Sequence, residues 1–133
     1  MNLLTIDDDY DTTEAVTDYC KIRGIDCKVA NKGRQGLFEI QKREYDLILL
    51  DIAMPEFTGF DILSQLKKQG VRYKTIVIFT AWRSKMEDFK DYTEVGVREI
   101  VKKPVELDHL DNIVKSYLMN VMQTDPNGLL SNQ

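Results

Sequence analysis

The sequence contains few of the side chains that cross-link proteins or bind transition metals. Its 133 residues include two cysteines and one histidine. A disulfide scaffold or a zinc site needs several such side chains at regular spacing, which Cys20 and Cys27 do not provide. We expect both to be buried reduced thiols, one on the apolar face of a helix and one in a strand. A chain of this length buries roughly two-thirds of its unfolded surface, so it needs neither cross-links nor a metal to fold.

Long apolar runs and an excess of positive charge are also missing. No window approaches the roughly 18 apolar residues of a membrane helix. The short apolar start runs directly into three aspartates, unlike a signal peptide. The 18 basic and 22 acidic residues give a net charge of −4, a poor basis for electrostatic binding of nucleic acid. We therefore expect a cytoplasmic domain that binds neither membrane nor nucleic acid.

The chain instead shows a regular alternation of strand-like and helix-like segments. The four residues Leu47–Leu50 have no polar face, so their strand should be covered on both sides. Five β-α repeats predict an α/β fold, a doubly wound five-stranded parallel sheet flanked by five helices. Strands are expected at residues 3–6, 25–30, 45–51, 75–79 and 97–102, and helices at 11–23, 33–43, 60–69, 84–95 and 107–121.

One domain accounts for nearly the whole chain. We place it at residues 1–122. Residues 123–133 are polar, include Pro126 and Gly128, and are expected to form a loose tail.

Chemically active side chains follow four of the five expected strands. Three aspartates, Asp7, Asp8 and Asp9, come after the first strand. The others are Asp51 after the third strand, Thr80 after the fourth, and Lys102 and Lys103 after the fifth. A doubly wound sheet carries its site outside the carboxyl ends of its strands. We therefore expect carboxylates, a hydroxyl and an ammonium group to share one pocket.

Such a cluster would be costly without a function. Two carboxylates about 4 Å apart repel by about 4 kcal/mol at an effective dielectric constant of about 20. Bound Mg²⁺ would remove this repulsion, because the ion prefers oxygen ligands. An ammonium group and a hydroxyl group beside it could hold the oxygens of a phosphoryl group. Each residue alone has an ordinary structural interpretation, and for Asp9 a turn or helix cap is preferred. Their joint placement favours a magnesium and phosphoryl site.

Four stretches of the sequence carry a resemblance to a known family. They are LLTIDDD at 3–9, LILLDIAMPEFTG at 47–59, IVIFTA at 76–81 and IVKKP at 100–104. The pattern D-x-x-M-P-x-x-x-G from Asp51 to Gly59 is the most specific of them. In order and spacing, these stretches resemble the receiver domain of two-component response regulators. The resemblance covers residues 1 to about 122 and implies a flavodoxin-like (βα)5 fold with strand order 2-1-3-4-5.

The resemblance also implies roles for the acidic residues. Asp51 matches the phosphoacceptor. Asp8 matches a direct Mg²⁺ ligand, and Asp7 matches its partner, which acts mainly through water. The backbone carbonyl of Ala53 matches the third protein ligand, so its side chain need not be polar.

Two further positions match groups that hold the phosphoryl group. Thr80 resembles the switch hydroxyl. Lys103, rather than Lys102, matches the family lysine, because the Lys-Pro pair fixes the register, and Pro104 would follow a cis peptide bond. The apolar Ala53 and the bulky Trp82, each two residues beyond a site residue, would shield the acyl phosphate from water.

The function implied is a phosphorylation-dependent switch rather than a conventional enzyme. The expected phosphodonor is a sensor histidine kinase, a phosphotransfer protein or a small phosphate compound. Phosphorylation would alter binding of a downstream protein, and the chain would be a monomer or weak dimer.

One position departs from the family pattern. Three residues before the lysine, the family usually has a Tyr or Phe that rotates on activation, whereas this chain has Ile100. Isoleucine is stiff at χ1 and cannot make that movement. A phosphorylation-independent binding module is therefore the main alternative. A haloacid-dehalogenase-type phosphatase is weaker, because its second acid would stand at Ala53. The strands exclude a histidine phosphotransfer protein, and His109 is expected to be exposed on the last helix.

Overall fold

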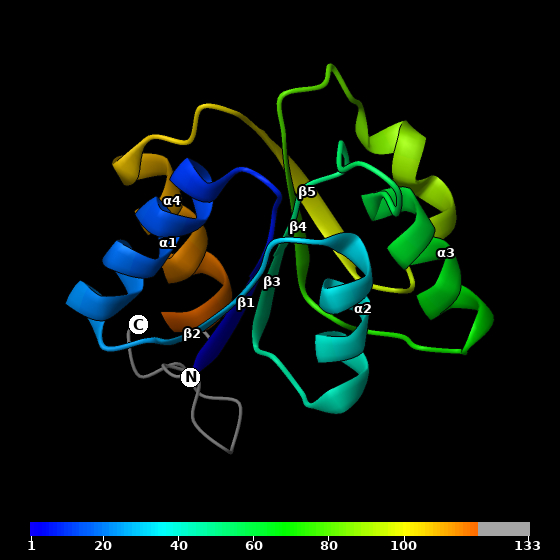
Figure 1. The fold of residues 1–133 in the computed structure, drawn as a ribbon, viewed down its shortest axis with the longest axis horizontal. Helices are drawn as coiled ribbons and strands as arrows, with labels where there is room; N and C mark the ends of the chain where they lie inside the picture. The colour runs from blue at the N-terminus through cyan, green and yellow to red at the C-terminus, as the bar shows by residue number, and fades with distance from the viewer. Residues whose placement is uncertain (120–133) are drawn as a thin grey trace, which may run out of the picture.

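A computed structural model describes residues 1–119 and shows one five-stranded parallel sheet in the order β2-β1-β3-β4-β5 (Figure 1). The predicted fold class and strand order are confirmed. The expected tail at residues 123–133 and the end of the last expected helix lie outside the described residues. The strands are β1 (Asn2–Ile6), β2 (Asp26–Ala30), β3 (Leu47–Leu50), β4 (Ile76–Thr80) and β5 (Val97–Lys102).

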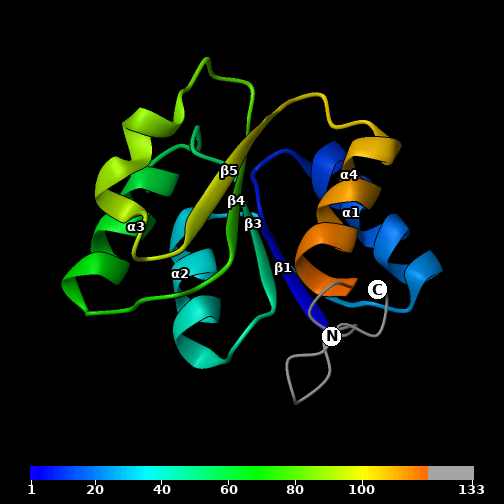
Figure 2. The same ribbon diagram turned by 180° about the vertical axis from the view of Figure 1, so that it is seen from behind.

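Helices cover both faces of the sheet, as Figures 1 and 2 show from opposite sides. On one face lie α1 (Tyr10–Arg23) and α4 (Leu107–Val114). The other face carries α2 (Gly33–Lys42), α3 (Gly59–Lys68) and the short helix η1 (Met86–Tyr92). A separate apolar core lies on each face, because successive strand residues point to opposite sides: Leu4 and Ile48 join one core, Leu3 and Leu47 the other.

The central strand β3 is buried along its whole length. All four of its residues, Leu47–Leu50, are buried, and β1 and β4 flank it on either side. The expectation that this strand is covered on both faces is confirmed. Asp51 follows directly, so the sheet fixes its backbone where the strand emerges from the core.

Local sequence determines where the helices nearest the sheet edge begin. Asp9 caps α1, and Gly24 ends that helix in the left-handed conformation with φ 71°. Thr58 and Asp61 form a capping box at the start of α3. A β-carbon at Gly59 would lie 2.5 Å from the carbonyl oxygen of Asp51, so the loop after β3 closes tightly only with glycine there.

The segment predicted as a helix at 84–95 is a shorter 3-10 helix, η1. Its three-residue period places Phe89 and Tyr92 on one side, where both meet Phe60 of α3. The ring centroids of Phe60 and Phe89 are 5.1 Å apart, and Phe89 is completely buried. These aromatic contacts join η1 to α3.

The last predicted helix also differs in detail. It is α-helical only as far as Val114 and continues as a π-helical turn, η2 (Lys115–Met119). Leu107 was expected on the buried stripe but is 67% exposed, because it is the first residue of the helix and projects beyond the core. Leu110 and Val114 are buried as expected, and Val121 lies outside the described residues.

Candidate functional site

Three aspartates meet at the carboxyl edge of the sheet. Oxygen atoms of Asp7, Asp8 and Asp51 all lie within 4.8 Å of one another. Asp7 and Asp51 are buried, at 1% and 3% exposure, whereas Asp8 is exposed. Asp7 and Asp51, which are 44 positions apart in the sequence, therefore lie together because both follow parallel strands of one sheet. Two buried carboxylates and one exposed carboxylate thus form an oxygen-rich cluster at this edge of the sheet.

Asp7 is the most constrained of the three. Its backbone N–H donates to the carbonyl of Ala30 at 3.0 Å, and its Oδ1 accepts from the N–H of Asp9 at 2.9 Å. Its Oδ2 lies 2.6 Å from the Nζ of Lys103. Burial raises the pKa of Asp7 from 3.8 to about 6, even though the hydrogen bond from Lys103 acts in the opposite direction. The nearby charge of Asp51 adds to the rise.

Asp51 is held at the end of β3 by contacts on both sides. Its backbone N–H donates to the carbonyl of Ile6 at 2.9 Å. Its Oδ1 accepts a hydrogen bond from the backbone N–H of Ala53 at 3.1 Å, and its Oδ2 lies 3.6 Å from the Nζ of Lys103. This carboxylate is fixed in orientation but has its second oxygen directed toward a cation.

The two lysines after β5 have different surroundings. Lys102 is exposed, whereas the side chain of Lys103 is only 14% exposed and its ammonium lies between Asp7 and Asp51. Burial by itself would lower the pKa of Lys103, but the hydrogen bond and charge of Asp7, with the charges of Asp51 and Asp9, outweigh it and raise that pKa. The Lys103–Pro104 peptide bond is cis, as the resemblance implied.

Thr80 lies at the end of β4 and is completely buried. Its Oγ1 accepts a hydrogen bond from the backbone N–H of Trp82 at 3.1 Å. This contact ties the threonine to the loop after β4, in which Trp82 is 55% exposed. A movement of the Thr80 hydroxyl would therefore be transmitted through one hydrogen bond to the backbone of Trp82, whose side chain is exposed.

Asp9 stands apart from the other acidic residues and has the structural role preferred for it. Its Oδ1 accepts from the N–H of Asp11 at 3.0 Å, and its Oδ2 accepts from the hydroxyl of Thr12 at 2.8 Å. The hydrogen bond from Thr12 is the main reason that the pKa of Asp9 is lowered. Both carboxylate oxygens therefore accept hydrogen bonds from the first turn of α1.

Asn31 belongs to the support of the site and was missed in the sequence. Its Nδ2 donates to the carbonyl of Asp7 at 2.9 Å and to the Oγ1 of Thr13 at 3.3 Å. It thereby connects the end of β2 with the end of β1 and with α1. Asn31 immediately follows the second predicted strand. A search for polar side chains directly after every expected strand, including this one, would have found it.

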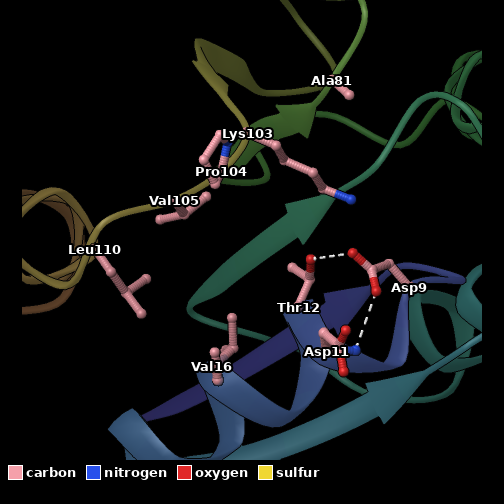
Figure 3. Close-up of a pocket in the computed structure, with 10 residues that line it drawn as sticks. Asp9, Asp11, Thr12, Val16, Ala81, Lys103, Pro104, Val105 and Leu110 are labelled. Carbon is pink, nitrogen blue, oxygen red and sulfur yellow. Dashed lines mark hydrogen bonds between the residues drawn. The ribbon is translucent and has the colours of Figure 1, made fainter.

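A cavity of about 470 Å³ adjoins the site on the side of α1 (Figure 3). It lies between the first turns of α1 and the segment that follows β5, and Lys103 reaches across its upper rim. Thr12 and Val16 line it from α1, and Pro104 and Val105 from the opposite side. The lysine is thus accessible from a mostly apolar recess as well as from the acidic cluster.

The donor atoms fit a hard divalent cation. The cluster offers carboxylate oxygens alone, and Asp8 keeps the rim polar and open to water, as Mg²⁺ requires. Asp8, Asp51 and, through water, Asp7 would hold the ion. Ala53 is adjacent through its N–H, and a ligand role for its carbonyl stays a prediction.

Comparisons with known proteins agree with this geometry. The family model described as the response regulator receiver domain matches residues 3–115. The transcriptional regulatory protein CiaR of Streptococcus pneumoniae is 30% identical over 118 residues, which is 89% of this chain and 51% of that protein. DltR of Streptococcus agalactiae is 31% identical over 110 residues, 83% of this chain and 48% of that protein. The chain therefore spans about half the length of these curated relatives.

Solved structures show the same fold. The receiver domain of the Francisella response regulator 1452 is 28% identical, with a TM-score of 0.76 over 90% of this chain and 98% of that one. The response regulator TrrA of Thermotoga maritima, solved with Mg²⁺ and BeF, is 26% identical, with a TM-score of 0.74 over 88% of this chain and 98% of that one.

Proposed function

Because this chain belongs to the receiver domain family of two-component response regulators, we propose that Asp51 accepts a phosphoryl group in a Mg²⁺-dependent reaction. One observation carries the assignment. Asp51 is a buried carboxylate, oriented by the N–H of Ala53, with one oxygen 3.6 Å from the ammonium of Lys103. Asp7 is also buried, but its closest partner is Lys103 at 2.6 Å, which suits a supporting role.

The chain's own groups supply orientation and charge for the transfer. A carboxylate oxygen of Asp51 attacks phosphorus, and the bond to the donor atom breaks as its electron pair leaves with the donor. Lys103 neutralises charge on the transferred oxygens, and the hydroxyl of Thr80 donates to one of them. Mg²⁺, held by Asp8, Asp51, the Ala53 carbonyl and a water on Asp7, would supply further neutralisation of charge. Hydrolysis of the acyl phosphate resets the switch.

Receiver domains interact with histidine kinases or phosphotransfer proteins, and we propose such a protein as the donor here. The cavity between α1 and the segment after β5 gives it a route to the site, since it opens beside Lys103. We further propose that phosphorylation alters binding of a downstream protein. The monomeric or weakly dimeric state and the cytoplasmic location also stay predictions. In the described residues no helix is long and apolar enough to cross a membrane.

The alternatives receive less support. A module that does not depend on phosphorylation would have no use for two buried aspartates and a partly buried lysine at one point. A dehalogenase-type phosphatase would need an acid at Ala53, where only the backbone N–H contacts Asp51.

Intact mass measurement tests the proposal. The chain is incubated with acetyl phosphate with and without Mg²⁺, and a gain of one phosphoryl group is expected only with the metal. Asp51→Asn should show no gain, whereas Lys102→Ala, a matched change of an exposed neighbour of the site, should match the wild type. Labelling of the Asp51→Asn variant at the wild-type rate would exclude Asp51 as the acceptor.

A further inference from the structure

The peptide groups on either side of Asp8 are each held by one hydrogen bond. Asp8 is exposed, so its direction depends on the backbone that carries it more than on packing around its side chain. In the peptide group before it, the carbonyl of Asp7 accepts from the Nδ2 of Asn31 at 2.9 Å. In the peptide group after it, the N–H of Asp9 donates to the Oδ1 of Asp7 at 2.9 Å. Because a peptide group is planar, these two contacts together determine the backbone dihedral angles of Asp8.

Asn31 is itself held at the end of β2, beside the strand that leads to Asp7. The carbonyl of Ala30, one residue earlier, accepts from the N–H of Asp7 at 3.0 Å. The Nδ2 of Asn31 also donates to the Oγ1 of Thr13 at 3.3 Å, which uses the second hydrogen of the amide. Thr13 is 3% exposed, and its N–H donates to the carbonyl of Asp9 at 3.1 Å. The amide of Asn31 thus contacts one end of the loop between β1 and α1 directly and the other end through Thr13.

The side chain of Asn31 fills no part of the apolar cores. Asn31 is half-buried, and together with Asp8 it lines a cavity of about 290 Å³ between the start of α2 and the loop after β3. Exposed residues, among them Tyr10 and Glu56, also line this cavity. Removal of the amide would therefore enlarge a space at the surface and leave the packing of the cores unchanged. Its main contribution is the direction of its hydrogen bonds.

We propose that Asn31 is a positioning residue for Mg²⁺, which sets the affinity for the ion by orienting Asp8. The inference rests on the proposed function, because it takes Asp8 as a direct ligand. Mg²⁺ requires a nearly octahedral set of oxygen atoms at about 2.0–2.1 Å. A rotation of the peptide group between Asp7 and Asp8 would move the Asp8 oxygens out of such a set. Loss of a group that orients a metal ligand typically lowers metal affinity by roughly 10- to 100-fold.

Asn2 offers a matched control at the opposite end of β1. Its Nδ2 donates to the carbonyl of Glu44 at 2.9 Å, the same kind of contact and the same length as that between Asn31 and Asp7. Asn2→Ala therefore removes an equivalent hydrogen bond from the same sheet, far along the strand from the acidic cluster. A difference in Mg²⁺ affinity between the two alanine variants reports on position relative to the metal site.

The experiment titrates Mg²⁺ into the metal-free full chain and follows binding by amide NMR, while urea unfolding measures stability. Asn31→Ala should bind Mg²⁺ roughly tenfold more weakly than the wild type, and Asn2→Ala should bind it within about twofold of the wild type. The urea midpoints of the two variants should fall by similar amounts. Asn31→Leu, which keeps approximately the same volume but has no donor, should lose as much affinity as Asn31→Ala.

A double variant tests whether Asn31 acts through Asp8. In the Asp8→Ala background, adding Asn31→Ala should change Mg²⁺ affinity by less than about twofold, because the ligand that Asn31 orients is already absent. A further tenfold loss there, or wild-type affinity in Asn31→Ala and Asn31→Leu, would overturn the inference. Wild-type protein that binds no Mg²⁺ would contradict the proposed function as well. Binding that is lost in Asp8→Ala but kept in Asn31→Ala would contradict this inference alone.

Discussion

Lys103 holds Asp7 more closely than it holds Asp51. Its Nζ is 2.6 Å from the Oδ2 of Asp7 and 3.6 Å from the Oδ2 of Asp51. The ammonium is therefore anchored on the supporting carboxylate and directed toward the proposed acceptor. A phosphoryl group on Asp51 would bring new anionic oxygens next to a cation that is already in position, so little reorganisation is needed.

Removing this ammonium should affect both stability and phosphoryl transfer. Lys103→Ala leaves two buried carboxylates without a counter-charge, and we expect a loss of about 1–3 kcal/mol in the free energy of unfolding, limited because Asp7 can take up a proton. Phosphoryl uptake should fall roughly a hundredfold. Lys102→Ala should change stability by less than about 0.5 kcal/mol. Urea unfolding and intact mass measure the two effects, and a larger defect in the Lys102 variant would contradict the assignment.

The raised pKa of Asp7 predicts a pH dependence of stability in metal-free protein. The carboxyl titrates near 3.8 when unfolded and at about 6 when folded, so the folded chain binds this proton more tightly. The resulting stabilisation is complete below about pH 3.8 and is lost as the pH rises through about 6, an effect on the order of 3 kcal/mol.

The contribution of Asp7 is isolated by comparison with Asp7→Asn. The difference in unfolding free energy between the two proteins should change between about pH 4 and 6 and be flat above that range. Saturating Mg²⁺ should flatten the wild-type curve, because a metal ion favours the ionised carboxylate. A difference that is independent of pH would show that Asp7 has an ordinary pKa.

Neighbouring aspartates should differ sharply in their effect on the metal. Asp8→Ala removes a ligand from a site with few protein ligands, so Mg²⁺ affinity should fall by at least about tenfold. Asp9→Ala removes a helix cap, which should cost about 1 kcal/mol of stability and leave Mg²⁺ affinity nearly unchanged. Calorimetric titration measures the Mg²⁺ affinity of each variant, and thermal unfolding measures its stability. Equal losses of affinity would mean that the register of the aspartate run is wrong.

The response to phosphorylation should be concentrated near Thr80. Ile100 is partly buried against one of the two apolar cores and lacks the large side chain that turns inward in most receiver domains. We therefore expect allosteric coupling through η1, β5 and α4 to lie below about 1 kcal/mol. Amide NMR with beryllofluoride, a phosphoryl mimic, should shift Thr80 and the loop to Lys85 more than residues 99–110. Equal shifts in both regions would show that no aromatic switch is needed.

The sequence predicted those features that depend on local pattern. Unbroken apolar runs such as Leu47–Leu50 located the central strands, and the parallel order then placed Asp7, Asp51, Thr80 and Lys103 at one edge. The spacing within 84–95 predicted a helix, and the structure has the shorter 3-10 helix η1 there, packed on Phe60 from a distant part of the chain. The unequal distances of Lys103 from its two carboxylates likewise depend on tertiary packing, which no spacing in the sequence encodes.

The central claim is that Asp51 carries an acyl phosphate, and chemical location of the phosphoryl group tests it most directly. Protein phosphorylated with acetyl phosphate and Mg²⁺ is reduced with borohydride, which converts an aspartyl phosphate to homoserine, and its peptides are sequenced by mass spectrometry. The account predicts homoserine at position 51 alone, and none in protein treated without Mg²⁺. Homoserine at position 7 or 8, or a phosphoryl group that resists borohydride, would contradict it.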